Sequence, residues 1–182
     1  MTEEQNQNPP GGVPEAAAVA SPRRWGILVA LSLATTIIQF DQSGMTLALP
    51  HVQAELEATT QQLQWVMDAY SLALASVVLT AGAISDRYGR RKVFLLGIAV
   101  LATGSLIGAL APDANVVIAG RALMGVGGAM FMPGTLSIIT HVFDRDTRPT
   151  AIGIWGAVTS LGVIIGPLIS GAVLQIWHWR GI

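Results

Sequence analysis

The chain has 182 residues, of which 52% are apolar and only 12% are charged. An ordinary soluble domain is about one-quarter charged, so this composition argues against a soluble globular protein. The net charge of −1 excludes little, because in a membrane protein the placement of charge matters and its sum does not. The sequence offers no basic surface for nucleic acid, and without cysteine it has no disulfides or thiolate metal sites. The three histidines are scattered along the chain, and no metal or cofactor is predicted.

Residues 1–22 are rich in Pro, Gly, Gln and Glu. A segment of this composition buries too little apolar surface to offset the entropy lost on ordering, so it is predicted to be a disordered tail. It differs from a secretory signal because Arg23 and Arg24 come late and the apolar run after them is too long.

Long apolar stretches alternate with short polar ones over residues 23–182. Each stretch reaches the roughly 20 residues that a helix needs to cross a bilayer. We expect an all-α, polytopic membrane protein with five transmembrane helices, at 25–50, 63–85, 93–111, 115–140 and 151–176. The strands of a β-barrel would be about ten residues long and would alternate polar with apolar residues, unlike these segments.

Basic residues predict the orientation of these helices, because cytoplasmic loops collect Lys and Arg. Eight of them fall on the side of the N-terminus and of the second and fourth connections, at positions 23, 24, 87, 90, 91, 92, 145 and 148. The opposite connections contain only Arg180. The N-terminus is therefore expected in the cytoplasm, in a multi-pass protein of the cell membrane, with Ile182 outside.

The first span contains an acid, Asp41, which is a candidate functional group because its burial is costly unless a cavity, a partner or a proton offsets it. A polar stripe at helical spacing beside it is predicted to line an aqueous cavity or, alternatively, to hydrogen-bond neighbouring helices. Its members are Thr35, Gln39, Gln42 and Thr46.

Arg121 in the fourth span lies at nearly the same depth as Asp41, counting about 1.5 Å of rise per residue. The two side chains are therefore predicted to share a cavity, and the alternative is that Arg121 extends to the outer headgroups. Asp68 is near the start of its helix, where the dipole favours an acid, and we interpret it as solvated. Glu55 and Glu57 are also interpreted as solvated residues of the outer connection.

The connection between the second and third spans reads GAISDRYGRRK at 82–92. Gly89 permits a tight reversal, and Gly82 would let another helix approach closely. Asp86 stands there among four cations, Arg87, Arg90, Arg91 and Lys92. A loop biased towards positive charge would explain the cations but not the spacing of Gly82, Asp86 and Gly89. The segment resembles the signature loop of the major facilitator superfamily.

Three further segments resemble motifs of this family, in the family's order. FDQSGMTLALP at 40–50 is similar to the first-helix motif of the fourteen-helix multidrug-efflux branch. RALMGVGGA at 121–129 is similar to the motif in which an arginine assists proton movement. The fifth span resembles the antiporter motif through Gly153, Gly162, Gly166, Pro167 and Gly171.

The resemblance implies part of the N-terminal half of a drug:proton antiporter that works by alternating access. Asp41 and Arg121 would couple protons to a small-molecule substrate, and Gly82, Asp86, Arg87, Gly89, Arg90 and Arg91 would form a gating motif. Residues 23–182 would be a partial transmembrane domain in the lipid bilayer, incomplete without a C-terminal half and unable to transport alone. Alternatives are a truncated, non-transporting membrane protein and proton-linked uptake of a nutrient. Enzymatic activity has no support, because no nucleophile, base and orienting group occur together.

Overall fold

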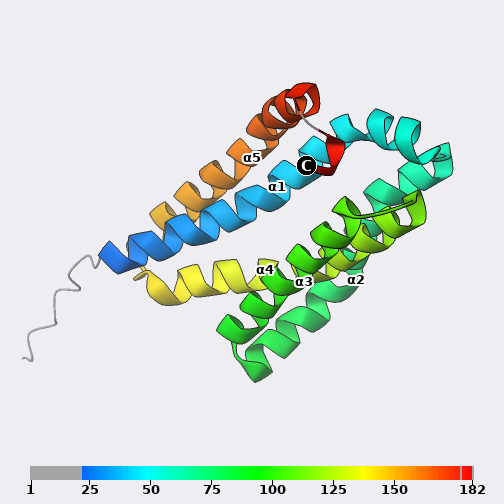
Figure 1. Ribbon diagram of the computed structural model, residues 1–182. Coiled ribbons are helices and arrows are strands. Elements are labelled where there is room, and N and C mark those ends of the chain that lie inside the picture. Colours follow the sequence, from blue (N-terminus) through cyan, green and yellow to red (C-terminus); the bar gives the residue numbers. More distant parts are fainter. Residues whose placement is uncertain (1–21, 177, 182) are drawn as a thin grey trace, which may run out of the picture.

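The computed structural model describes residues 22–176 and 178–181. These residues form α1 (Pro22–Leu56), α2 (Thr60–Tyr88), α3 (Arg90–Ala109), α4 (Ala114–Val142), α5 (Arg148–Ile176) and the short 3-10 helix η1 (Trp179–Gly181) (Figure 1). The five α-helices are long and apolar enough to cross a membrane, which confirms the predicted all-α polytopic fold. The predicted disordered tail lies outside the described residues except for Pro22, with which α1 begins.

Most helix ends lie within three residues of the sequence-based expectation, but the end of α1 and the connection between α2 and α3 differ in kind. The first span was expected to end at Pro50, but α1 continues through this proline to Leu56. A proline inside a helix removes one backbone hydrogen bond and bends the helix, and here it does not end it. The inner connection is a sharp break rather than a loop, because only Gly89 separates α2 from α3. Its φ of 101° lies in a region that glycine adopts readily, which allows the two helices to follow each other directly.

The helices form two groups, one of α1 with α5 and one of α2, α3 and α4 (Figure 1). Within the second group, α4 packs against both α2 and α3. Near the start of α1, α4 also joins the first group through a buried cluster formed by Leu28, Leu31, Ile139, Phe143 and Ala151. Thus α4 contacts every other long helix and can hold a functional residue in the interior.

Glycines allow α3 and α4 to pack with their backbones in contact. A Cβ on Gly120 would lie 2.8 Å from the carbonyl oxygen of Gly104, and a Cβ on Gly127 would lie 2.6 Å from the amide nitrogen of Leu101. Close packing of this kind through small residues is typical of membrane helices.

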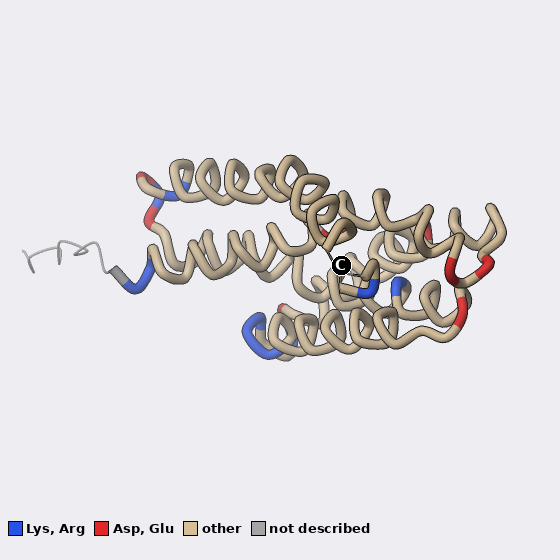
Figure 2. The backbone as a smooth tube through the Cα atoms, turned by 45° about the horizontal axis from the view of Figure 1, so that its top comes forward, with Lys and Arg blue, Asp and Glu red and all other residues tan. Residues whose placement is uncertain are grey.

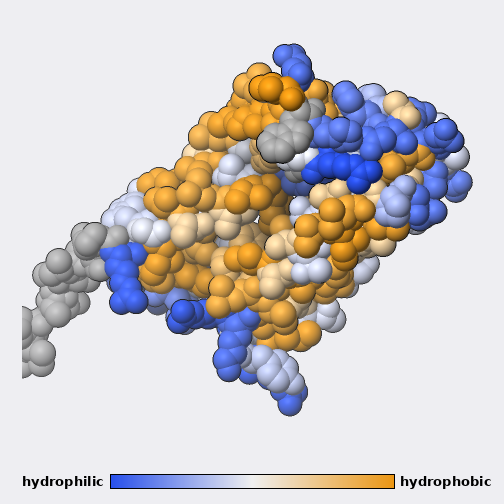
Figure 3. Space-filling view, viewed as in Figure 1, coloured by the Kyte–Doolittle hydropathy of each residue, from blue (hydrophilic) through white to orange (hydrophobic). Residues whose placement is uncertain are grey.

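The surface of the helices is apolar in the middle and polar at the ends, as a membrane protein requires. Figure 3 shows apolar side chains over the middle of the visible face, with hydrophilic side chains at both ends. Large apolar residues such as Leu79, which is 84% exposed, are stable at such a surface only if lipid or protein covers them. Charged residues also gather near the helix ends, and most Lys and Arg lie at the end where α1 begins (Figure 2).

Candidate functional site

Asp41 and Arg121 form a buried ion pair between α1 and α4. Nη1 of Arg121 donates to Oδ2 of Asp41 at 2.5 Å, and the two side chains are 4% and 15% exposed. The alternative interpretation, in which Arg121 extends to the outer headgroups, does not describe this structure. A charge at this level of burial requires a partner, and removing either member of such a pair typically costs about 3–5 kcal/mol.

The remaining edges of the Arg121 guanidinium are also occupied. Nη2 donates to Oε1 of Gln42 at 3.2 Å, and Nε donates to the carbonyl oxygen of Val66 at 3.1 Å. The planar face lies over the ring of Tyr70, 5.0 Å from its centroid. Residues of α1 and α2 therefore fix the orientation of a side chain that α4 provides.

Two adjoining cavities lie beside the ion pair and share Asp41. One is lined by Met45, Ser105, Gly108, Ala109, Val117, Arg121, Met124, Trp179 and Arg180 together with Asp41. The other is lined by Ile37, Ile38, Phe40, Tyr70, Leu101, Ser105 and Met124 as well as Asp41. Both linings are mostly apolar, as is usual for sites that hold lipophilic molecules. Asp41 is the one carboxylate in them, and the first cavity also contains the guanidinium groups of Arg121 and Arg180.

Only one member of the predicted polar stripe reaches the ion pair, and that is Gln42. Thr35 is buried, donates to the carbonyl oxygen of Leu31 and accepts from Nε1 of Trp155. Gln39 lies against Gly162 of α5, and Thr46 is exposed. Neither of these two lines the cavities around Asp41, because that face of α1 is shared with α5.

The predicted gating motif lies at the break between α2 and α3. Oδ1 of Asp86 accepts from Nε and Nη2 of Arg90 at 3.1 and 3.0 Å, so the pair bridges Gly89. Nη1 of Arg90 lies 3.1 Å from Nδ1 of His141 at the end of α4. Arg87 and Arg91 are exposed. Among the described residues, nothing lies within 4 Å of a Cβ on Gly82, so the close approach predicted there is not observed.

The glycines of the predicted antiporter motif fall into two sets. Gly162 and Gly166 face α1, where a Cβ would meet the carbonyl oxygen of Thr36 at 2.7 Å and would overlap the hydroxyl of Ser43, respectively. Gly153 and Gly171 have open space in the part of the chain that the structure describes. Pro167 lies inside α5, next to the α1 contact. The motif therefore positions α5 against the helix that carries Asp41.

Sequence reasoning missed a polar cluster at the outer end of α1. Glu55 is exposed and belongs to α1 rather than to the outer connection. Its carboxylate accepts from Nε1 of Trp179 and from Arg180, and it lies 3.1 Å from Nε2 of His178. Nη1 of Arg180 also donates to the carbonyl oxygen of Ala109 at 3.1 Å. The available signal was an acid next to a helix end and a distant Trp-Arg pair, but no spacing rule joins segments so far apart.

Comparison with protein families identifies the fold that carries this site. The model of the Major Facilitator Superfamily matches residues 31–182, which is most of the chain. The chain belongs to the major facilitator superfamily. A crystal structure of a bacterial homologue of the human lysosomal transporter Spinster, inward-facing and unoccupied, has the same fold, with a TM-score of 0.77 at 23% identity over 85% of this chain and 32% of that one.

Several relatives of the chain are named as resistance or efflux proteins. The multidrug efflux pump LfrA of Mycolicibacterium smegmatis is 38% identical over 161 residues, covering 88% of this chain and 32% of the pump. The puromycin resistance protein pur8 of Streptomyces alboniger is 36% identical, covering 87% of this chain and 32% of its own length. The tetracenomycin C resistance and export protein of Streptomyces glaucescens is 31% identical over the whole chain and 34% of its own length. This chain thus spans about a third of the relatives that it matches.

Proposed function

We propose that this chain is part of the N-terminal half of a proton-coupled exporter of lipophilic compounds, including cationic ones. The observation that carries the proposal is the buried Asp41–Arg121 pair on the wall of an apolar cavity. Ionisable residues at membrane depth are commonly the groups that bind ions and substrates. Export is favoured over uptake because LfrA, pur8 and the tetracenomycin C protein are named as efflux, resistance or export proteins.

The pair provides a simple coupling mechanism. With Asp41 ionised, Arg121 neutralises it and the site is closed by their contact. A proton on Asp41 removes the negative charge that holds the guanidinium, and a cationic substrate competes with Arg121 for the same carboxylate. Because proton and substrate cannot occupy Asp41 together, loading one releases the other. Alternating access then turns inward proton flow into outward movement of the substrate.

The proposal includes the placement of the chain in the cell membrane. Residues 1–22 would be a cytoplasmic tail, and residues 23–182 would be a partial transmembrane domain whose substrate pathway is completed by a C-terminal half. The gathering of basic residues near the start of α1, at the α2–α3 break and before α5 supports a cytoplasmic N-terminus (Figure 2).

The test replaces Asp41 in a full-length transporter that contains these 182 residues. Asp41→Asn keeps the shape of the side chain and removes the titrating group, so it should abolish ethidium export driven by a pH gradient while leaving membrane insertion near normal. Asp68→Asn is the matched control, because Asp68 also lies in a membrane-spanning helix but is exposed and has no ion-pair partner among the described residues.

Three outcomes would contradict the proposal. Export that still responds to the pH gradient after Asp41→Asn would place the coupling carboxylate elsewhere, and loss after Asp68→Asn alone would identify it as Asp68. Uptake of ethidium along with protons would replace antiport by symport.

A further inference from the structure

Tyr70 of α2 is a buried aromatic residue that the coupling mechanism does not use. Its side chain is 3% exposed, and its ring lies under the guanidinium of Arg121 with 5.0 Å between Cζ and the ring centroid. Since the three guanidinium nitrogens already have hydrogen-bond acceptors, the ring is the contact that remains on the planar face. A cation over an aromatic face is attracted by about 0.5–2 kcal/mol, with the larger values in desolvated sites.

Two glycines of α4, Gly125 and Gly128, form the surface against which Tyr70 packs. A Cβ on Gly125 would clash with the carbonyl oxygen of Tyr70, and a Cβ on Gly128 would lie 2.8 Å from its hydroxyl and 3.5 Å from Cζ. Arg121, Gly125 and Gly128 are spaced by four and three residues and therefore share one face of the helix. Glycine on this face lets the ring pass beneath the guanidinium.

The hydroxyl of Tyr70 lies at the far end of the ring, against Gly128 and beside the side chain of Gln42, with which it forms no hydrogen bond of good geometry. Phenylalanine in its place would keep the ring beneath the guanidinium. The contact with Arg121 depends on the ring alone.

We infer that Tyr70 is a positioning residue of the ion pair, whose ring holds the Arg121 guanidinium in contact with Asp41. This inference rests on the proposed function for its effect on transport. Groups facing Asp41 from the other elements are Arg121 of α4, Tyr70 of α2, Ser105 of α3 and, across the cavity, Arg180 of η1. Without the ring, Arg121 keeps its hydrogen bonds, but nothing packs against the planar face of its guanidinium. The guanidinium can then shift, and Asp41 no longer alternates cleanly between a paired and a free state.

The experiment compares two transport modes of the full-length transporter with ethidium as the probe. Proton-driven efflux needs the switch at Asp41, whereas counterflow of labelled against unlabelled ethidium at equal pH needs only binding and the conformational change. Tyr70→Leu should lower proton-driven efflux about tenfold, which is the size of effect expected from the loss of a cation–aromatic interaction. It should leave counterflow nearly unchanged. Tyr70→Phe should retain both activities.

Phe131→Leu is the matched control, because Phe131 is a buried aromatic residue of the same hydrophobic cluster and makes no contact with Arg121. It should affect the two modes equally through packing alone. A parallel loss of both modes in Tyr70→Leu would show that Tyr70 acts only in packing. Loss of proton-driven efflux in Tyr70→Phe would assign the role to the hydroxyl and would also overturn the inference.

A second measurement separates this inference from the proposed function. The thermal unfolding of the full-length transporter in lipid nanodiscs is compared for Tyr70→Leu, Arg121→Gln and the double variant. If the ring holds the guanidinium, the double variant should lose less in Tm than the two single losses together. Additive losses would refute the contact. If the unmodified transporter shows no proton-driven efflux, the proposed function is rejected. The comparison of single and double variants then still decides the role of Tyr70.

Discussion

Ser43 of α1 fills the space that a methyl group on Gly166 of α5 would need. A Cβ there would overlap the hydroxyl of Ser43 and would lie 3.1 Å from the carbonyl oxygen of Phe40. The hydroxyl itself donates to the carbonyl oxygen of Gln39 at 2.9 Å, which holds it against its own helix. At this point, two residues from Asp41, the backbones of α1 and α5 are in contact.

Gly166→Ala should therefore destabilise the chain by about 1–3 kcal/mol, the usual range for overpacking a close contact. Ser43→Ala in the same chain removes the overlapping oxygen and should recover part of the loss. Thermal unfolding in detergent micelles measures both effects. Gly171→Ala provides the control, because a Cβ at Gly171 meets nothing within 4 Å in the part of the chain that the structure describes. Equal losses from Gly166→Ala and Gly171→Ala would contradict the packing of α1 on α5.

The sequence predicts the five helices and the common depth of Asp41 and Arg121 for related physical reasons. Apolar length identifies a membrane helix, and the rise per residue converts a position into a depth, so two ionisable residues at similar depth are expected to share a cavity. Depth does not determine which direction a side chain faces around its helix. Hence the contacts of Arg121 with Tyr70 and Val66, and the facing of Gln39 towards α5, follow only from the packing of whole helices.

The outer cluster shows a second limit of sequence-based prediction. Glu55 and Arg180 are 125 residues apart, and each lies in a segment that looks solvated when considered alone. Their contact depends on where η1 folds back over the helix ends, which no local pattern encodes. The same limit applies to Gly82, Gly153 and Gly171, whose motif suggests packing against helices although the described residues leave them open.

Asp86→Asn is expected to slow turnover more than it weakens substrate binding. Asp86 and Arg90 connect the ends of α2 and α3 across Gly89, and Arg90 continues to His141 of α4. The pair is exposed, so it contributes at most about 1 kcal/mol to stability, and its loss should change the balance of conformations rather than the fold. Initial rates of export over a range of ethidium concentrations separate kcat from KM.

The control for this change is Asp146→Asn. Asp146 is exposed in the connection between α4 and α5 and has no ion-pair partner among the described residues, so its neutralisation should leave kcat and KM unchanged. A normal kcat with a raised KM in Asp86→Asn would indicate substrate contact and would contradict a role in conformational change.

The membrane orientation can be measured because the chain contains no cysteine. A cysteine that replaces Glu57, between α1 and α2, should react with a membrane-impermeant thiol reagent in intact cells. A cysteine that replaces Arg91, at the start of α3, should react only after the cells are permeabilised. Both positions are exposed, so accessibility depends only on the side of the membrane. Labelling of position 91 but not 57 in intact cells would reverse the topology.

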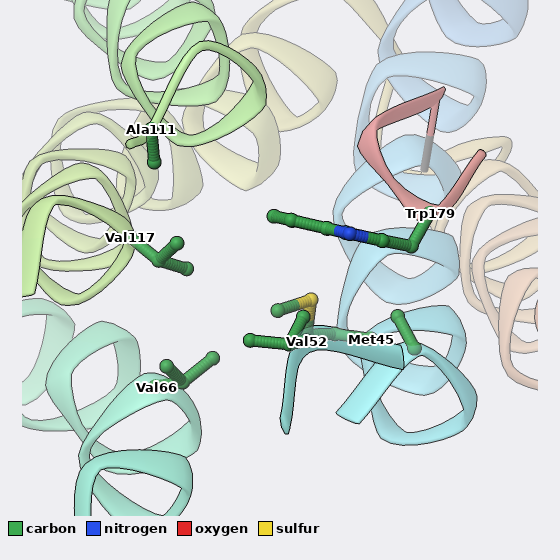
Figure 4. Close-up of a cluster of buried hydrophobic side chains, with 7 residues drawn as sticks. Met45, Val52, Val66, Ala111, Val117 and Trp179 are labelled. Atoms are coloured by element: carbon green, nitrogen blue, oxygen red, sulfur yellow. The ribbon is translucent and has the colours of Figure 1, made fainter. Parts of the chain in front are cut away.

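The last prediction concerns the outer cluster, in which Glu55 holds η1 over the cavity. The indole of Trp179 is 6% exposed and points from η1 towards Val117, between α1 and the α3–α4 pair (Figure 4). Its Nε1 donates to Glu55, and Arg180 donates to Glu55 and to the end of α3. These bonds tie the outer ends of α1 and α3 together above a cavity that Asp41 and Arg121 also line.

Glu55→Ala should release Trp179 and open this cavity from the outer end. A cysteine that replaces Val117, which is 2% exposed beneath the indole, reports the opening through its rate of reaction with a water-soluble thiol reagent. Because the indole then covers Val117 for less of the time, the cysteine should react several-fold faster than it does with Glu55 in place. Glu57→Ala should leave the rate unchanged, because among the described residues Glu57 has no ion-pair partner. An unchanged rate in Glu55→Ala would show that apolar packing around Trp179, rather than the bonds to Glu55, keeps the outer end closed.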